Sequence, residues 1–170
     1  MNRPKTNEFA PYYNTYISLV EDGNALPVLD AQSAELRAVL SAVPEEKGAF
    51  AYATGKWTIK EVLSHLIDGE RMFAYRILRI SRGDTTPIEG FEQDGYIENS
   101  NANNRSFAEL LQEFELQRQS NLLMLNNISD EGSRRMGTAS DKAVSVRALT
   151  YIMAGHVQHH MSILRERYLA

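Results

Sequence analysis

The sequence contains no cysteine among its 170 residues. This absence excludes disulfide bridges, thiolate metal sites, iron–sulfur clusters and cysteine nucleophiles, so any metal must be bound by His, Asp or Glu. Positive charge is also scarce, because 18 Lys and Arg residues stand against 22 Asp and Glu residues and give a net charge of -4. A positive surface that would attract nucleic acid or an anionic membrane is therefore not expected.

Long apolar runs are missing as well. The stretch from Met1 to Tyr13 contains charges, Asn and Pro where a secretory signal would have an apolar core. No later segment approaches the roughly 20 consecutive apolar residues of a membrane-spanning helix. The chain still has 43% hydrophobic residues, enough for a sizeable core, and its length fits one domain over residues 1–170. We therefore expect a soluble, cytoplasmic protein with a single domain.

The arrangement of apolar residues favours helices. They recur at spacings of three and four, the period of one helix face, and the alternation typical of strands is almost absent. This pattern predicts an all-α fold, a four-helix bundle preceded by a short extra N-terminal helix. Two capping boxes, Thr58–Glu61 and Ser106–Glu109, mark the starts of two long helices. The predicted helices cover about residues 9–20, 25–42, 59–81, 107–128 and 145–168, with polar loops over 84–105 and 129–144.

The last predicted helix carries two histidines within its apolar stripe. Leu149, Met153, His156, His160 and Ile163 follow one another at steps of four, three, four and three residues. Both imidazoles should therefore point into the bundle, and residues four apart on one helix face can bind the same ion. His156 and His160 are accordingly candidate metal ligands.

A neighbouring histidine and a known motif are set aside. His159 lies at the border of the same stripe and is left out of the ligand set. Val157 stands where the zinc-protease motif requires Glu, so the metalloprotease interpretation fails.

The third candidate ligand is His65, on the flank of the buried face of the helix over 59–81. Glu61 and Asp68 flank it at i−4 and i+3, where they could orient its ring or a bound water, and Asp68 is a candidate catalytic residue. Gly69 removes a side chain from this face, either to leave room for metal, water or substrate or to allow close helix packing. The alternative for all three histidines is that hydrogen bonds within the core satisfy them.

Polar residues also interrupt the stripe of the helix over 107–128. Arg118 and Asn121 occupy positions where a bundle normally has Leu. Arg118 is the second candidate catalytic residue, because its planar guanidinium could bind a substrate carboxylate. The alternative, which we favour from the sequence, is a structural pair with an acid on another helix. Gln32 faces inward in a similar way.

Three runs of sequence resemble a known family, namely residues 57–71, 90–96 and 154–160. With them the chain resembles the DinB-like superfamily over roughly residues 25–168. That superfamily includes metal-dependent hydrolase-like proteins, bacillithiol S-transferases and mycothiol-dependent maleylpyruvate isomerases. The resemblance implies a four-helix bundle in which one histidine of the second helix and two of the last bind a divalent metal, often nickel or zinc. These roles fall on His65, His156 and His160.

The resemblance also carries expectations about activity. It implies a metal-dependent thiol S-transferase or hydrolase that acts on a small molecule, with a low-molecular-weight thiol as a co-substrate of the transferase reaction. It also implies a homodimer, because homodimers are common in this superfamily. Nickel or zinc is expected first, and iron or manganese are alternatives. The segment from Glu92 to Tyr96 matches a family segment near the mouth of the bundle, where Asp94 and its neighbours could supply a base or a lid, although a solvated loop is the simpler interpretation. The alternative function is a non-catalytic bundle that keeps the metal site to bind a small ligand or to dimerise.

Overall fold

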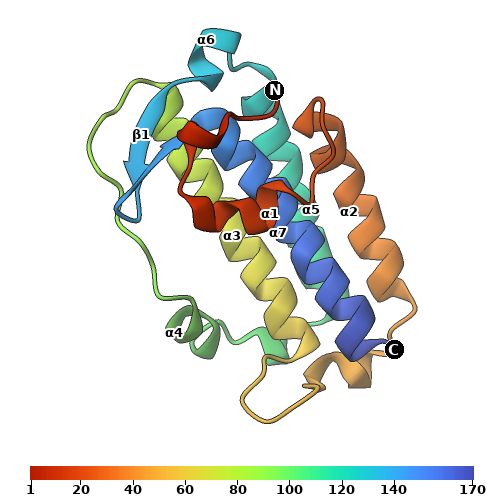
Figure 1. Cartoon of the computed structure of the whole chain (residues 1–170). Helices are drawn as coiled ribbons and strands as arrows, with labels where there is room; N and C mark the ends of the chain where they lie inside the picture. Colours follow the sequence, from red (N-terminus) through yellow and green to blue (C-terminus); the bar gives the residue numbers. More distant parts are fainter.

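The computed structural model describes all residues 1–170 and confirms the predicted all-α bundle (Figure 1). The long helices are α2 (Ala25–Ser41), α3 (Ile59–Ser81), α5 (Phe107–Asn126) and α7 (Val146–Ile163). The short elements are η1 (Thr6–Glu8), η2 (Pro11–Tyr13), α1 (Asn14–Ile17), η3 (Glu45–Ala49), α4 (Gln93–Glu98), η4 (Ala102–Asn104), α6 (Asp130–Ser133) and the π-helical turn η5 (Leu164–Tyr168). None of these helices has both the length and the apolar character needed to cross a bilayer.

The helix starts lie where the capping boxes predicted them. The Thr58 hydroxyl accepts a hydrogen bond from the Glu61 backbone N–H, and the Glu61 carboxylate accepts one from the Thr58 N–H at 2.8 Å. Ser106 and Glu109 form the same reciprocal pair at the start of α5. Since these bonds satisfy N–H groups that have no partner within the helix, the boxes fix where α3 and α5 begin.

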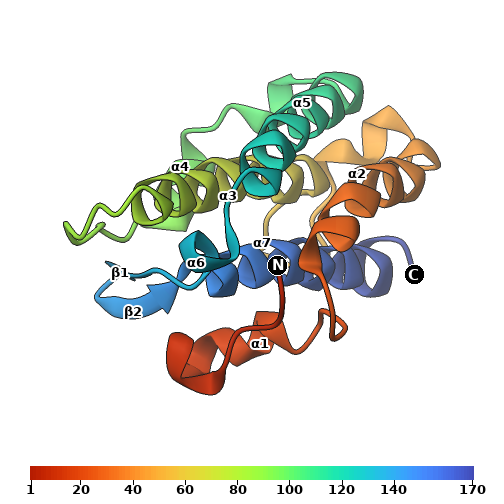
Figure 2. The same cartoon turned by 90° about the horizontal axis from the view of Figure 1, so that it is seen from above.

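The long helices are not packed in chain order. α3 contacts α5 and α7, and α2 contacts the same two helices, so α2 lies diagonally opposite α3 (Figure 2). The N-terminal segment with α1 lies against the outer side of α7 (Figure 2). This order makes α3 and α7, the two helices that carry the candidate ligands, direct neighbours.

The predicted loop over 129–144 is wrong in part, because it contains a β-hairpin. Strand β1 (Met136–Ala139) pairs antiparallel with β2 (Lys142–Ser145), so that Met136 faces Ser145 and Ala139 faces Lys142. The loop over 84–105 contains the short helix α4 and the 3-10 helical turn η4. The hairpin and this loop meet at a bridge between Ile88 and Ala139.

A polar layer divides the interior into two hydrophobic clusters. One cluster joins α1, the hairpin, the start of α2, the ends of α3 and α5 and the start of α7. The other joins the end of α2, the starts of α3 and α5 and the end of α7. Between them lie four buried polar side chains, which we call the polar layer: Gln32, Glu70, Arg118 and Asn121. On α7, His156 lies at the same level, between a residue of each cluster, Ala154 and Val157. The candidate site therefore borders the middle of the bundle.

Candidate metal centre

The three predicted histidines come together between α3 and α7. His65 on α3 and His156 and His160 on α7 each offer a ring nitrogen, and these nitrogens all lie within 4.8 Å of one another. The Nε2 atoms of His65 and His156 are 2.8 Å apart, a distance at which one ring donates a hydrogen bond to the other, so this pair also fits the alternative of histidines satisfied within the core. The ring centroids are separated by 4.7 to 4.8 Å in each of the three pairs. The convergence that the helical spacing predicted is therefore present.

All three imidazoles are neutral at physiological pH. His65 and His156 are only 4% and 7% exposed, and His160 is half-buried. Burial lowers the pKa of His65 to about 4 and, together with the neighbouring imidazoles, that of His160 to about 3. Burial first, and then the charges of the other histidines and of Arg118, hold the pKa of His156 well below its usual value. A neutral imidazole has the free lone pair that a metal ion requires.

Two glycines allow close packing around His156, one beside its ring and one beside its helix. A Cβ atom on Gly69 would lie 3.0 Å from Cε1 and 3.2 Å from Nδ1 of His156, closer than carbon atoms normally approach. The side chain missing from α3 thus makes room for an imidazole rather than for a metal or a substrate. On the other side, a Cβ on Gly155 would overlap the backbone carbonyl of Tyr16, so this glycine lets the N-terminal segment pack directly on α7.

Aromatic rings surround the imidazoles. The Trp57 ring packs on His65 with centroids 4.7 Å apart, and the rings of Phe73 and Tyr16 each meet His156 edge-on at 5.6 Å. Such rings exclude water from the buried side of the cluster and hold the imidazoles in place.

The fourth histidine is outside the cluster, as the sequence argument proposed. His159 is half-buried and packs on Tyr16 and on the ring of His160, and it does not belong to the converging group.

The donor set fits a divalent transition metal. Nitrogen–metal bonds of about 2.0–2.1 Å require two donors on one ion to be no more than about 4.2 Å apart. The 2.8 Å pair satisfies this limit, which applies to two donors on opposite sides of the ion. In a tetrahedral site the donors are about 3.4 Å apart, so the widest separation, within 4.8 Å, needs to close by up to about 1.4 Å. Three imidazoles without a carboxylate suit zinc, nickel, iron or copper, and they leave at least one coordination position for another molecule.

The flanking carboxylates make other contacts than those expected. Asp68 forms an ion pair with Arg71 at 3.5 Å, and burial raises the pKa of its carboxyl. Glu61 caps α3 through the Thr58 N–H. Neither carboxylate has a hydrogen bond to His65, so a catalytic role for Asp68 stays a prediction.

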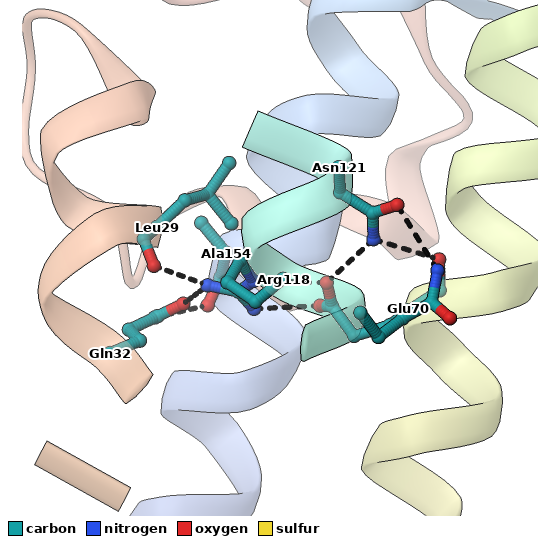
Figure 3. Close-up of polar contacts among 7 residues, drawn as sticks. Leu29, Gln32, Glu70, Arg118, Asn121 and Ala154 are labelled. Carbon is teal, nitrogen blue, oxygen red and sulfur yellow. Dashed lines mark hydrogen bonds and ion pairs between the residues drawn. The ribbon is translucent and has the colours of Figure 1, made fainter. Parts of the chain in front are cut away.

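Arg118 lies in the polar layer and is 1% exposed (Figure 3). Its guanidinium forms a two-point ion pair with Glu70 on α3, at 2.9 Å from Nε and 2.6 Å from Nη2. Its Nη1 donates to Gln32 at 3.0 Å, and Asn121 donates to Glu70 at 2.9 Å. Gln32 in turn donates to the backbone carbonyl of Ala154 at 2.8 Å, two residues before the first ligand on α7. These contacts match the alternative of a structural pair, while a catalytic role for Arg118 stays a prediction.

The residues of the segment around α4 line two different pockets. Asp94 lines a pocket that His160 also lines, whereas Tyr96 lines a separate depression. Glu92 caps α4 by accepting from the backbone N–H groups of Asp94 and Gly95. Only Asp94 thus lies where a base near the histidines would be needed.

Sequence reasoning missed most of this pocket. It has a volume of about 280 Å³ and is lined by Tyr52, Gly55, Lys56, Trp57, Val62, Asp94, His160, Ile163 and Tyr168. Tyr52 and Lys56 come from a loop and Tyr168 from the π-helical turn η5, where no helical periodicity indicates a direction.

Comparison with known proteins places these observations in a family. The model of the DinB superfamily matches residues 29–164. No curated protein sequence matches significantly. Among solved structures, the fold is similar to that of YfiT from Bacillus subtilis, described as a probable metal-dependent hydrolase with an unusual four-helix bundle topology. The TM-score is 0.78 at 16% sequence identity, with 90% of this chain and 95% of that chain covered.

Proposed function

The chain belongs to the DinB superfamily, and from this premise we propose that it is a metal-dependent hydrolase of a small molecule, with His65, His156 and His160 as the metal ligands. The observation that carries the proposal is the convergence of three neutral, largely buried imidazoles. The description of YfiT as a probable metal-dependent hydrolase supports the reaction class. A divalent ion in such a site supplies Lewis-acid activation of water or of a substrate carbonyl.

The chain's own residues would divide the remaining tasks. The two buried imidazoles and the rings of Trp57 and Phe73 keep water from the inner side of the cluster. His160 is half-buried and lines the pocket, so we propose that substrate enters from this side. The Asp94 carboxylate lines the same pocket and is the group that we propose accepts a proton there. Asp68 and Arg118 form no hydrogen bond with the three histidines. They would therefore influence the site only indirectly, Asp68 through α3 and Arg118 through the polar layer.

The single tryptophan of the chain makes metal binding directly measurable. Because the Trp57 ring is 4.7 Å from the ring of His65, we expect Ni²⁺ to quench its fluorescence with a stoichiometry of one. The protein should be purified without a His tag, and elemental analysis should give the bound metal. The variants His156→Ala and His160→Ala should lose the effect, and His159→Ala is the matched control that should keep it. Loss of binding in the control to the same degree, or no metal in the unmodified protein, would contradict the proposal.

Activity is tested separately, on protein loaded with nickel, zinc, iron or manganese and on chelated protein. Hydrolysis of simple esters and amides should require the metal and should be lost in His160→Ala. A thiol-plus-electrophile assay on the same samples tests the S-transferase activity that the family resemblance implies. Metal binding without turnover in either assay would instead support the non-catalytic ligand-binding function.

The binding partner, the oligomeric state and the cellular location are further parts of this proposal. We propose a small molecule as partner rather than nucleic acid, since the net charge is -4. A homodimer and a cytoplasmic location stay predictions, and light scattering on the purified protein tests the first.

A further inference from the structure

The pocket beside His160, which we call the slot, is lined by three aromatic residues, Tyr52, Trp57 and Tyr168. Tyr52 and Tyr168 meet edge to face with ring centroids 4.9 Å apart, and Trp57 forms the wall that leads to His65. The Tyr168 hydroxyl donates to the backbone carbonyl of Trp57 at 2.6 Å, so the π-helical turn η5 is fastened to the loop before α3. This hydrogen bond therefore holds Tyr168, which follows the end of α7, against Trp57, which precedes the start of α3.

The size of the slot limits what it can hold. A cavity of roughly 150 Å³ is large enough for benzene, and this one has about 280 Å³. One planar ring with a substituent therefore fits, whereas most pockets for larger ligands exceed about 300 Å³. A depression of about 420 Å³ on α5 is larger, but its lining has one hydrophobic residue and does not include the histidines.

Two charged side chains line the slot, Lys56 and Asp94. Asp94 lies in the first turn of α4, whose backbone N–H groups at Asp94 and Gly95 are capped by Glu92. Lys56 has no ion pair or side-chain hydrogen bond in the structure, so its ammonium group is free to bind an anion. The Asp94 carboxylate would attract a ligand cation, whereas the metal bound by His160 would repel it, a step that rests on the proposed function.

From these observations we propose that the slot binds a small planar carboxylate. Its ring or other flat apolar part lies among Tyr52, Trp57 and Tyr168, and its carboxylate pairs with Lys56. Its remaining end faces His160. The substrate class of the proposed hydrolase is accordingly a small aromatic or similarly planar acid that carries the hydrolysable group.

Trp57 fluorescence reports binding without any turnover. Benzoate, benzamide and benzylamine have the same ring and differ in charge, so they are titrated in parallel into chelated protein and into Zn²⁺-loaded protein. Benzoate should bind about three- to fivefold more tightly than benzamide, the effect of one partly exposed ion pair, and benzylamine should bind most weakly. Lys56→Met should remove the preference for benzoate and leave the affinity for benzamide unchanged, while Lys47→Met, a change at another exposed lysine, should alter neither.

A second pair of variants tests the walls. Tyr52→Ala should weaken all three probes by about two- to tenfold, whereas Tyr12→Ala, at an exposed tyrosine outside the slot, should have no effect. Tightest binding of benzylamine, or no saturable change with any probe, would overturn the inference. Elemental analysis of the same samples distinguishes failure of this inference from failure of the proposed function. A protein that contains metal but binds none of the probes contradicts only the proposed ligand of the slot, whereas a protein that binds no metal contradicts the proposed function.

Discussion

Removal of one partner of the buried ion pair in the polar layer should strongly destabilise the fold. Arg118→Met leaves the Glu70 carboxylate, 1% exposed, with Asn121 as its remaining side-chain donor. An unpaired buried charge of this kind costs about 3–5 kcal/mol of unfolding free energy, a large part of the roughly 5–15 kcal/mol that holds a domain together. For a chain of this length the melting temperature should fall by about 6–20 °C.

The double variant Glu70→Leu/Arg118→Met provides the critical comparison. Because no charge is left buried, it should be more stable than either single variant, although Asn121 and Gln32 lose partners at a cost of about 1–3 kcal/mol. The measurement is urea unfolding followed by circular dichroism, with a chelator present so that bound metal adds no stability. Arg37→Met is the control, because its pair with Glu115 is on the surface and should contribute less than about 1 kcal/mol. Additive losses in the double variant, or single losses as small as that of the control, would refute the reasoning.

Three further substitutions test particular contacts. Gly155→Ala forces the N-terminal segment away from α7 because the new Cβ overlaps the Tyr16 carbonyl, so stability in urea should fall by about 1–3 kcal/mol and protease should cleave the segment sooner. Gly69→Ala should separate stability from metal binding: the helix gains up to about 1 kcal/mol, while the crowded His156 ring should lower Ni²⁺ affinity about tenfold, as read from the fluorescence titration. Glu8→Gln should flatten the acid limb of the stability curve. Hydrogen bonds from Arg147 lower the pKa of the Glu8 carboxyl from 4.5 to about 2, so its contribution to the free energy of unfolding is complete above pH 4.5 and is lost as the pH falls towards 2. Equal acid sensitivity in the variant and the unmodified protein would contradict this.

The sequence was most informative where the physics is local. Capping boxes at Thr58 and Ser106 involve residues three apart, and the structure begins α3 and α5 directly after them. The inward direction of His156 and His160 follows from the helical period alone. The β-hairpin was missed because each strand has four residues in a polar stretch, and its turn depends on positive φ angles at Ser140 and Asp141.

The ion pair between Arg118 and Glu70 could have been predicted from the helical pattern of α3. Glu70 lies four residues after Leu66 and seven before Ile77, both fully buried on α3, so the helical period places it on the inner face. A charged residue on that face is the acid that an inward Arg118 requires. By contrast, the pocket wall from Tyr168 depends on a π-helical turn and on a hydrogen bond to Trp57, 111 residues away, which no local pattern indicates.

The metal centre itself depends on a feature that periodicity cannot determine, namely which helices are neighbours. An inward histidine on α7 could face α2, α3 or α5, and His65 is 91 residues distant along the chain from His156. The histidines meet because α2 and α3 are diagonal, which leaves α3 beside α7. The polar layer holds this order, since Gln32 on α2, Glu70 on α3 and Arg118 on α5 form one network that reaches the Ala154 carbonyl of α7. A hydrophobic layer at this level would favour several helix arrangements of similar energy, whereas a hydrogen-bond network that all its members satisfy only in one arrangement favours that one. If this is why the network is buried, the Glu70→Leu/Arg118→Met protein should stay folded yet bind Ni²⁺ more weakly than the unmodified protein; unchanged affinity would show that the order of the helices is fixed by the apolar clusters alone.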